Sequence, residues 1–160
     1  MARWVYRAAA LALLAGIASC STPPPPPPTI VNLTLSAGPG VNPTASGQAA
    51  PIVIRVYQLA SPTAFEQAEF FQLFNQDQAF LKTDLIKRDD FLLAPRQTKT
   101  AALTPTDQVK ALGVLAAYRD FQHATWRATV PIPPHETTNV TITAGPEAVV
   151  VKAEPVKTGS

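Results

Sequence analysis

The sequence has almost none of the residues that build disulfides or metal centres. Its 160 residues include one cysteine, Cys20, and two histidines. A single cysteine cannot form an intramolecular disulfide, and His123 and His135 lack the close spacing and the cysteine neighbours of a zinc site. We therefore expect no metal and no cofactor, and a domain whose stability depends on its apolar core.

Recognisable catalytic motifs are also missing. No G-x-S-x-G nucleophile elbow occurs, and Gly38-Pro-Gly40 is neither a dinucleotide fingerprint nor a phosphate loop. Neighbouring residues on a strand point to opposite faces, so Asp89 and Asp90 are expected in a solvated turn beside Lys87 and Arg88 rather than in a catalytic pair. With no set of acid, base and nucleophile, we predict that the protein is not an enzyme.

An excess of one charge is absent once the N-terminus is set aside. Arg3 and Arg7 belong to a leader, and without them the 13 basic residues become 11, equal to the 11 acidic residues. A neutral domain has no electrostatic basis for binding nucleic acid or anionic lipid headgroups.

The N-terminus has the pattern of a lipoprotein signal. Two arginines precede the apolar run Leu11–Ser19, which is too short for a transmembrane helix but fits a secretory signal. Ile17-Ala-Ser-Cys20 matches the bacterial lipobox, in which the chain is cut before the cysteine and the thiol is acylated. We predict a signal peptide at 1–19 and lipidation of Cys20. Ser21, in place of the Asp that favours the inner membrane, indicates the outer membrane.

A proline-rich stalk follows the cysteine at residues 20–29. Consecutive prolines favour polyproline II at about 3.1 Å per residue, so Ser21–Pro28 would hold a domain roughly 25 Å from the bilayer. We interpret this segment as a spacer rather than as an SH3-type ligand. The folded domain is predicted at 30–153, with a flexible tail at 154–160.

Apolar and polar residues alternate with period two through most of the predicted domain. Alternate side chains of a strand point to opposite faces, so each segment has one face in a core and one in water. Short strands separated by Pro and Gly predict a mainly β fold, a two-sheet antiparallel β-sandwich with one added α-helix. Trp126 is expected to be buried, with a loss of about 3–5 kcal/mol on truncation to alanine. The segments are 31–35, 52–57, 112–118, 126–130, 139–143 and 149–151, with weaker candidates at 91–93 and 98–103.

One segment has helical signals instead. A capping serine precedes Pro62, and Phe65, Ala68 and Phe71 then follow three residues apart. The pattern predicts one helix over 62–75 with its aromatic side packed on a sheet.

The connection between the first two strands is unusually long. Residues 37–51 carry no charge and no periodicity. Hairpin loops are commonly two to five residues, so a loop of this length is either functional or disordered.

Several segments together resemble the TssJ lipoproteins of type VI secretion systems. The resemblance implies a transthyretin-like sandwich on the periplasmic face of the outer membrane. It also implies a protein that anchors the TssJ–TssL–TssM complex by binding the periplasmic C-terminal region of TssM. The segments that carry it are Val53–Leu59, Ala68–Leu73, Asp84-Leu85, Phe91–Pro95, Leu112–Asp120 and Trp126-Arg127.

The resemblance also implies that the loop after the first strand, Gly38–Gln48 by position, binds TssM. Since the loop is uncharged, we expect recognition by shape and backbone hydrogen bonds, with weak salt dependence. The tip is expected at Val41–Pro43. The residues expected to contact the partner are Gly38, Pro39, Gly40, Val41, Asn42, Pro43 and Thr44.

Two other functions stay open at this point. A small periplasmic hydrolase would need a concave site with convergent polar groups, and the sequence shows none. A periplasmic lipoprotein that binds a small ligand or inhibits an enzyme would need a cavity between the sheets, lined by Tyr57, Phe71 or Trp126.

Overall fold

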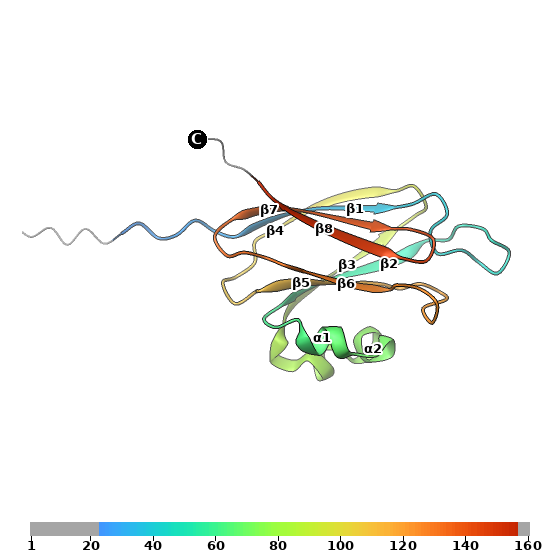
Figure 1. Ribbon diagram of the computed structural model, residues 1–160, viewed down its shortest axis with the longest axis horizontal. Helices are drawn as coiled ribbons and strands as arrows, with labels where there is room; N and C mark the ends of the chain where they lie inside the picture. Colours follow the sequence, from blue (N-terminus) through green and yellow to red (C-terminus); the bar gives the residue numbers. More distant parts are fainter. Residues whose placement is uncertain (1–22, 157–160) are drawn as a thin grey trace, which may run out of the picture.

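The computed structural model of the chain describes residues 23–156 (Figure 1). The predicted signal peptide at 1–19 and the predicted lipidation site Cys20 lie outside the described residues. None of the helices within 23–156 has the length and hydropathy needed to cross a membrane. Pro23–Pro28 are exposed, carry no secondary structure and lead into the first strand.

Eight strands form two four-stranded sheets that pack face to face, with a short helical layer beneath one of them (Figure 1). This confirms the predicted β-sandwich with added helical structure. We call the sheet with the order β4-β1-β7-β8 the open sheet, and the sheet with the order β3-β2-β5-β6 the covered sheet. The strands are β1 Ile30–Ala37, β2 Ile52–Leu59, β3 Leu85–Leu93, β4 Thr98–Leu103, β5 Ala111–Ala116, β6 Arg127–Pro131, β7 Thr137–Ala144 and β8 Val149–Pro155.

One strand pair departs from the antiparallel prediction. β1 and β7 run parallel, with Val31 opposite Thr138 and Leu35 opposite Ile142. The other neighbouring pairs of the two sheets are antiparallel. Alternation identifies the faces of a strand but not its direction. Between β1 and β7 the chain passes through the covered sheet twice, first as β2 and β3 and then as β5 and β6.

The main core lies between the sheets. In the open sheet, Val31, Leu33 and Leu35 of β1 are buried, while Asn32 between them is exposed. The predicted period of two therefore holds for this strand. Burial of such side chains contributes roughly 1.5–3 kcal/mol each.

The covered sheet is buried on its outer face as well. All six residues of β5 are buried, because the helical layer packs on the side that alternation predicts to be wet. Tyr57, Leu59 and Leu115 of this sheet form a second core cluster with Phe65 and Leu73 of the helical layer.

The single helix predicted over 62–75 is wrong. The chain forms α1 (Thr63–Gln67) and α2 (Phe70–Leu81), separated by extended backbone at Ala68, and a 3₁₀ turn (Lys82–Asp84) follows. Glu69 starts α2 through a reciprocal capping box with Gln72. The break changes the phase of the helix, so Phe70 is buried and Phe71 is exposed.

Polar side chains of the covered sheet attach the helical layer. Nη1 of Arg55 donates to the Phe74 carbonyl at 2.7 Å, and the Tyr57 hydroxyl donates to the Leu73 carbonyl at 3.2 Å. Arg127 donates to the Ala68 carbonyl. Burial raises the pKa of Tyr57 to about 12, which keeps its phenol neutral.

The expected turn around Asp89 and Asp90 is also wrong. Both residues lie in β3, which is much longer than the predicted segment 91–93. Nε of Arg88 lies 3.0 Å from Asp90 Oδ1, and Nη1 of the same guanidinium pairs with the buried Asp77 of α2. Pairing along the whole of β2 extends this charged segment into a strand.

Two further expectations change. Trp126 is only half-buried and precedes β6, with its ring 5.2 Å from that of Phe70. We therefore expect Trp126→Ala to cost less than the predicted 3–5 kcal/mol. β8 continues to Pro155, past the predicted end of the domain at residue 153.

Candidate functional site at the loop end

The β1–β2 loop lies at the end of the sandwich opposite the stalk (Figure 1). The stalk enters at the start of β1, whose eight residues then run to the far end. At about 3.3 Å per residue the two ends are roughly 26 Å apart. A protein tethered through its stalk therefore presents this loop away from the tether.

The base of the loop is packed into the domain. Val41 is 0% exposed and belongs to the main core, and Ala50 is buried beside it. The amide of Ala50 donates to the Val41 carbonyl at 3.1 Å, and the amide of Gly38 donates to the Ala144 carbonyl at 2.8 Å. The buried residues of the loop therefore hold it in an ordered conformation. This argues against the disordered alternative.

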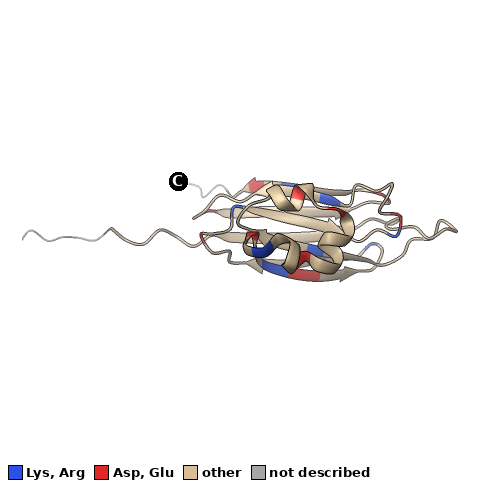
Figure 2. Cartoon of the chain, turned by 90° about the horizontal axis from the view of Figure 1, so that it is seen from below, with Lys and Arg blue, Asp and Glu red and all other residues tan. Residues whose placement is uncertain are grey.

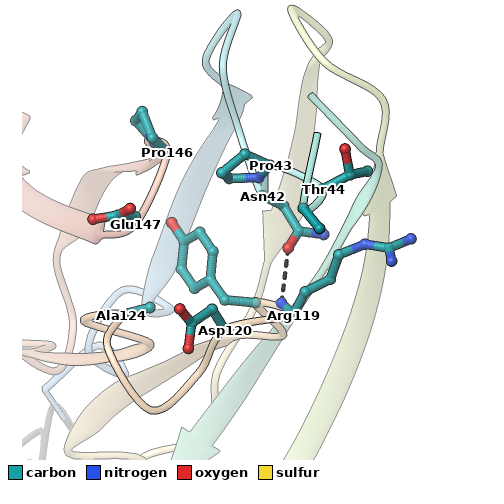
Figure 3. A pocket seen from close by; sticks show the side chains of 10 residues that line it. Asn42, Pro43, Thr44, Arg119, Asp120, Ala124, Pro146 and Glu147 are labelled. Carbon is teal, nitrogen blue, oxygen red and sulfur yellow. Dashed lines mark hydrogen bonds between the residues drawn. The ribbon is translucent and has the colours of Figure 1, made fainter. Parts of the chain in front are cut away.

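Asn42 connects the loop to a second loop. It has a positive φ of 49°, a conformation that asparagine tolerates better than most residues, and its side chain is 4% exposed. Its Nδ2 donates to the Pro51 carbonyl at 2.8 Å, and its Oδ1 accepts the Arg119 amide at 2.8 Å (Figure 3). One side chain thereby holds the β1–β2 loop against the β5–β6 loop.

The exposed tip is a small turn formed by Ala45–Gln48. Thr44 closes it, since its amide donates to the Gln48 carbonyl at 2.8 Å and its carbonyl accepts the Gly47 amide at 2.8 Å. Gly47 has a φ of 78°, which suits glycine.

The expected tip at Val41–Pro43 is therefore wrong, because Val41 and Asn42 are buried. Of the other residues expected to contact the partner, Pro39 is exposed, whereas Gly38, Gly40, Pro43 and Thr44 are half-buried. Whether these residues contact a partner stays a prediction.

A cleft of about 500 Å³ opens beside the loop (Figure 3). Its walls come from the β1–β2 loop, the β5–β6 loop and the β7–β8 turn. The residues that line it are Asn42, Pro43, Thr44, Ala45, Tyr118, Arg119, Asp120, Ala124, Pro146 and Glu147.

Hydrogen bonds hold the three segments in a fixed arrangement. The Thr125 amide donates to the Glu147 carbonyl at 2.8 Å, and the Tyr118 hydroxyl donates to the Gly145 carbonyl at 3.2 Å. Burial raises the pKa of Tyr118 above its usual value, so this phenol remains a neutral donor at physiological pH. Together with the Asn42 contact, these bonds preorganise the loop end before any partner binds.

The charge at this end comes from the neighbouring loops. The β1–β2 loop itself has no charged residue (Figure 2). Asp120 and Glu147 lie on the cleft, and the Arg119 side chain extends away from them beside Thr44 (Figure 3). The expectation of weak salt dependence therefore concerns the loop alone. The sequence did not connect these residues with the loop, because they lie far from it along the chain.

At the opposite end, one histidine holds the stalk. His135 Nδ1 lies 2.9 Å from the Pro27 carbonyl, and the His135 amide donates to the Thr29 hydroxyl at 2.8 Å. His123 instead pairs with the exposed Asp120. Within residues 23–156 no cluster of three His, Cys, Asp or Glu side chains could hold a metal ion.

The chain is similar to known type VI secretion lipoproteins. A family model described as "Type VI secretion lipoprotein, VasD, EvfM, TssJ, VC_A0113" matches residues 29–147. The T6SS lipoprotein TssJ1 from Pseudomonas aeruginosa is 41% identical with a TM-score of 0.78, and the match covers 82% of this chain and all of that one. Serratia marcescens Lip, a membrane-bound component of the type VI secretion system, is 32% identical with a TM-score of 0.71, over 83% and 99% of the two chains.

A more distant likeness concerns the fold alone. A chain in the structure of the TssM C-terminal domain from EAEC is 23% identical with a TM-score of 0.65, over 78% of this chain and 98% of that one. No curated protein sequence matches the chain.

Proposed function

We propose that this chain, which belongs to the TssJ family of type VI secretion lipoproteins, anchors a type VI secretion membrane complex by binding the periplasmic C-terminal region of TssM. The β1–β2 loop supplies the contact, and lipid on Cys20 supplies the attachment to the outer membrane. The observation that carries this proposal is the loop itself, which has a buried base and an exposed, uncharged tip at the end opposite the stalk.

The mechanism is tethering rather than turnover. A lipoprotein N-terminus carries three acyl chains, more than the two signals that suffice for stable membrane anchoring. The stalk supplies reach, and His135 holds its base against the domain. Confinement to the membrane raises the effective concentration of the loop for a partner that spans the periplasm.

A preorganised loop suits this role. Because Val41 and Asn42 already hold the loop in one conformation, binding does not have to order it. The tip of the loop then offers backbone and hydroxyl groups to a partner of complementary shape.

The ligand-carrier alternative has no support from Tyr57 and Phe71, two of the three side chains expected to line its cavity. Tyr57 is fully buried beneath the helical layer, whereas Phe71 is exposed to solvent. They do not face a common space between the sheets. The family is also one of structural components of a secretion machine rather than of enzymes.

Replacing only the tip of the loop tests the proposed contact. Thr44–Gln48 can be exchanged for two glycines, which leaves the buried anchors Val41 and Asn42 in place. We expect affinity for the periplasmic C-terminal region of TssM to fall at least about tenfold, as measured by isothermal titration calorimetry on the mature chain carrying Cys20→Ala. Thermal unfolding by circular dichroism checks that the fold is intact.

A matched control replaces Thr106–Gln108 by Gly-Ser-Gly in the β4–β5 connection, at the stalk end of the sandwich. This control should bind as the parent does. Unchanged affinity in the tip variant would place the TssM contact elsewhere on the domain.

Cys20→Ala tests the anchor in cells. The variant should fold but appear in the soluble periplasmic fraction rather than in the outer membrane, because it cannot be acylated. Recovery of the variant in the outer-membrane fraction at the wild-type level would contradict the lipid anchor.

A further inference from the structure

We infer, on the premise of the proposed function, that the same TssM region also contacts an aromatic patch beside the loop end. The patch consists of the exposed faces of Phe71 and Phe121, and Phe70, Phe74 and Trp126 support it from below. This inference extends the partner contact from the β1–β2 loop to the start of the helical layer.

The aromatic rings form one connected cluster around Phe70. Its ring stacks on that of Phe121 at 4.5 Å and on that of Phe74 at 5.4 Å, and it meets the edge of Trp126 at 5.2 Å. Phe71 packs edge-on against Phe121 at 5.0 Å. Phe70 is 7% exposed, so the cluster has a buried centre and an exposed rim.

Phe71 does not contribute to the buried face of α2. It is 54% exposed, whereas the buried residues of α2 are Phe70, Leu73, Asp77 and Leu81. Single exposed apolar residues are ordinary, and Leu92 and Val150 are examples within 23–156. Phe71 differs because it continues a group of partly exposed aromatic rings, and aromatic side chains are enriched at the centres of protein interfaces.

The backbone that carries Phe71 is attached to the covered sheet before any partner binds. Arg55 and Tyr57 donate hydrogen bonds to carbonyls of α2, and Arg127 donates to the Ala68 carbonyl, two residues before α2. The guanidinium groups of Arg55 and Arg127 also lie over the rings of Phe74 and Trp126, at 4.4 and 4.9 Å from the ring centroids. A partner therefore meets aromatic rings carried by a backbone segment that does not have to be ordered on binding.

The patch is continuous with the proposed loop contact. Asp120 lines the cleft and Phe121 is the next residue, so the β5–β6 loop contributes to the cleft and to the patch. The preceding residue, Arg119, is bonded to Asn42 of the β1–β2 loop. A partner surface that covers the tip of the loop and the cleft therefore ends on the same β5–β6 loop that carries Phe121.

The position of the patch also argues against a lipid occupant. Phe121 belongs to the β5–β6 loop, at the end of the sandwich opposite the stalk (Figure 1), and on the proposed function the stalk joins the domain to the lipid on Cys20. The membrane that would hold the anchor is therefore on the far side of the domain. A periplasmic protein surface with exposed apolar side chains is the occupant that this geometry fits.

Phe71→Ala in the mature chain carrying Cys20→Ala tests the inference. We expect its affinity for the periplasmic C-terminal region of TssM to fall at least about tenfold by calorimetry, the effect of an interface hot spot. Leu92→Ala is the matched control, because Leu92 is 58% exposed on β3 and belongs to no aromatic cluster. It should bind within about twofold of the parent.

Hydrogen exchange of the parent protein provides a second measurement that does not depend on folding of a variant. Amides of 69–74 and 120–123 should exchange more slowly in the TssM complex than in the free protein. No added protection in these segments, or wild-type affinity of a folded Phe71→Ala variant, overturns the inference. Self-association of the free chain that Phe71→Ala abolishes, with TssM affinity unchanged, also overturns it, because the occupant is then a second copy.

These outcomes separate the inference from the proposed function. If the glycine replacement of Thr44–Gln48 abolishes TssM binding while Phe71→Ala has no effect, the loop contact stands and the aromatic patch is excluded. If the patch variant and the tip variant both bind as the parent does, the loop contact fails as well.

Discussion

The two sheets share one core but have different surroundings on their outer faces. In the open sheet, β7 alternates between buried and exposed residues along most of its length, and hydroxyl and amide side chains occupy its wet face. In the covered sheet, every residue of β5 is buried. Period two therefore marks a strand with one wet face, and it fails where a further layer covers the sheet.

Polar residues on the outer faces also have different partners. In the open sheet they bond to each other, as with Asn32 and Asn139 at 3.0 Å and Ser36 and Thr143 at 3.3 Å. In the covered sheet Arg55, Tyr57 and Arg127 donate to carbonyls of the helical layer. The first set faces water, whereas the second set supplies donors at a packed interface. Substitutions should therefore affect stability on the covered side far more than on the open side.

The largest expected effect is at Phe65, which is fully buried between α1 and the covered sheet. Phe65→Ala should lower the free energy of unfolding by about 3–5 kcal/mol in urea, since it leaves a cavity under the helical layer. Phe71→Ala is the control from the same layer, and it should cost less than about 1 kcal/mol because Phe71 is exposed. Equal losses of stability in the two variants would contradict the placement of Phe65, and not Phe71, on the face of the helical layer that packs on the covered sheet.

Gly113 tests how closely the layer packs. A Cβ at this position of β5 would lie 2.9 Å from Leu59 Cδ1 and from Phe65 ring carbons. Gly113→Ala should therefore cost about 1–3 kcal/mol through overpacking. Combining it with Phe65→Leu should recover part of that loss in a double-mutant cycle. If Gly113→Ala left the free energy of unfolding unchanged, the helical layer would be able to move away from β5 with little loss of stability.

The next effect concerns the pH dependence of stability. Tyr57 has its pKa raised by burial to about 12, whereas an unfolded tyrosine titrates near 10. Above pH 10 the unfolded chain releases the phenolic proton while the folded chain retains it, so the free energy of unfolding should fall between pH 10 and about 12.

Tyr57→Phe checks this origin in urea titrations at several pH values. The variant should lose about 1 kcal/mol at neutral pH, with the hydrogen bond to Leu73, and should show a shallower fall above pH 10. Burial also raises the pKa of Tyr118, so part of the decrease in the free energy of unfolding above pH 10 should remain in the variant. An identical pH profile in the variant would rule out Tyr57 as a source.

The smallest effect should occur on the open sheet. Thr141 lies on the exposed face of β7, between β1 and β8. Thr141→Val keeps a β-branched side chain and should change the free energy of unfolding by less than about 0.5 kcal/mol. A loss comparable to that of Gly113→Ala would show that the open face is covered by another surface in solution.

The sequence predicted the strands better than the helical layer. Segments 31–35, 98–103 and 139–143 were placed correctly in β1, β4 and β7. In the helical layer the same kind of reading failed, because the break at Ala68 rotates the residues after it and exchanges the positions of Phe70 and Phe71. A three-residue spacing predicts which side of a helix is buried only while the helix is uninterrupted.

For the candidate site, the sequence located the loop but not its neighbours. Length and lack of charge identified residues 37–51 as a functional loop or a disordered one. The contact between Asn42 and Arg119, 77 residues apart, and the cleft shared with Glu147 could not be read from local pattern. These contacts depend on which strand ends meet, which is a property of the topology.

Local chemistry was therefore enough to predict a β-sandwich with a helical addition and a long uncharged loop, because alternation and turn residues act between near neighbours in the chain. Only the tertiary structure decided that Val41 and Asn42 are buried, that β5 is covered on both faces and that Phe71 faces solvent. Burial depends on which distant segments pack together, and the free energy of that packing is shared among residues that no local window contains.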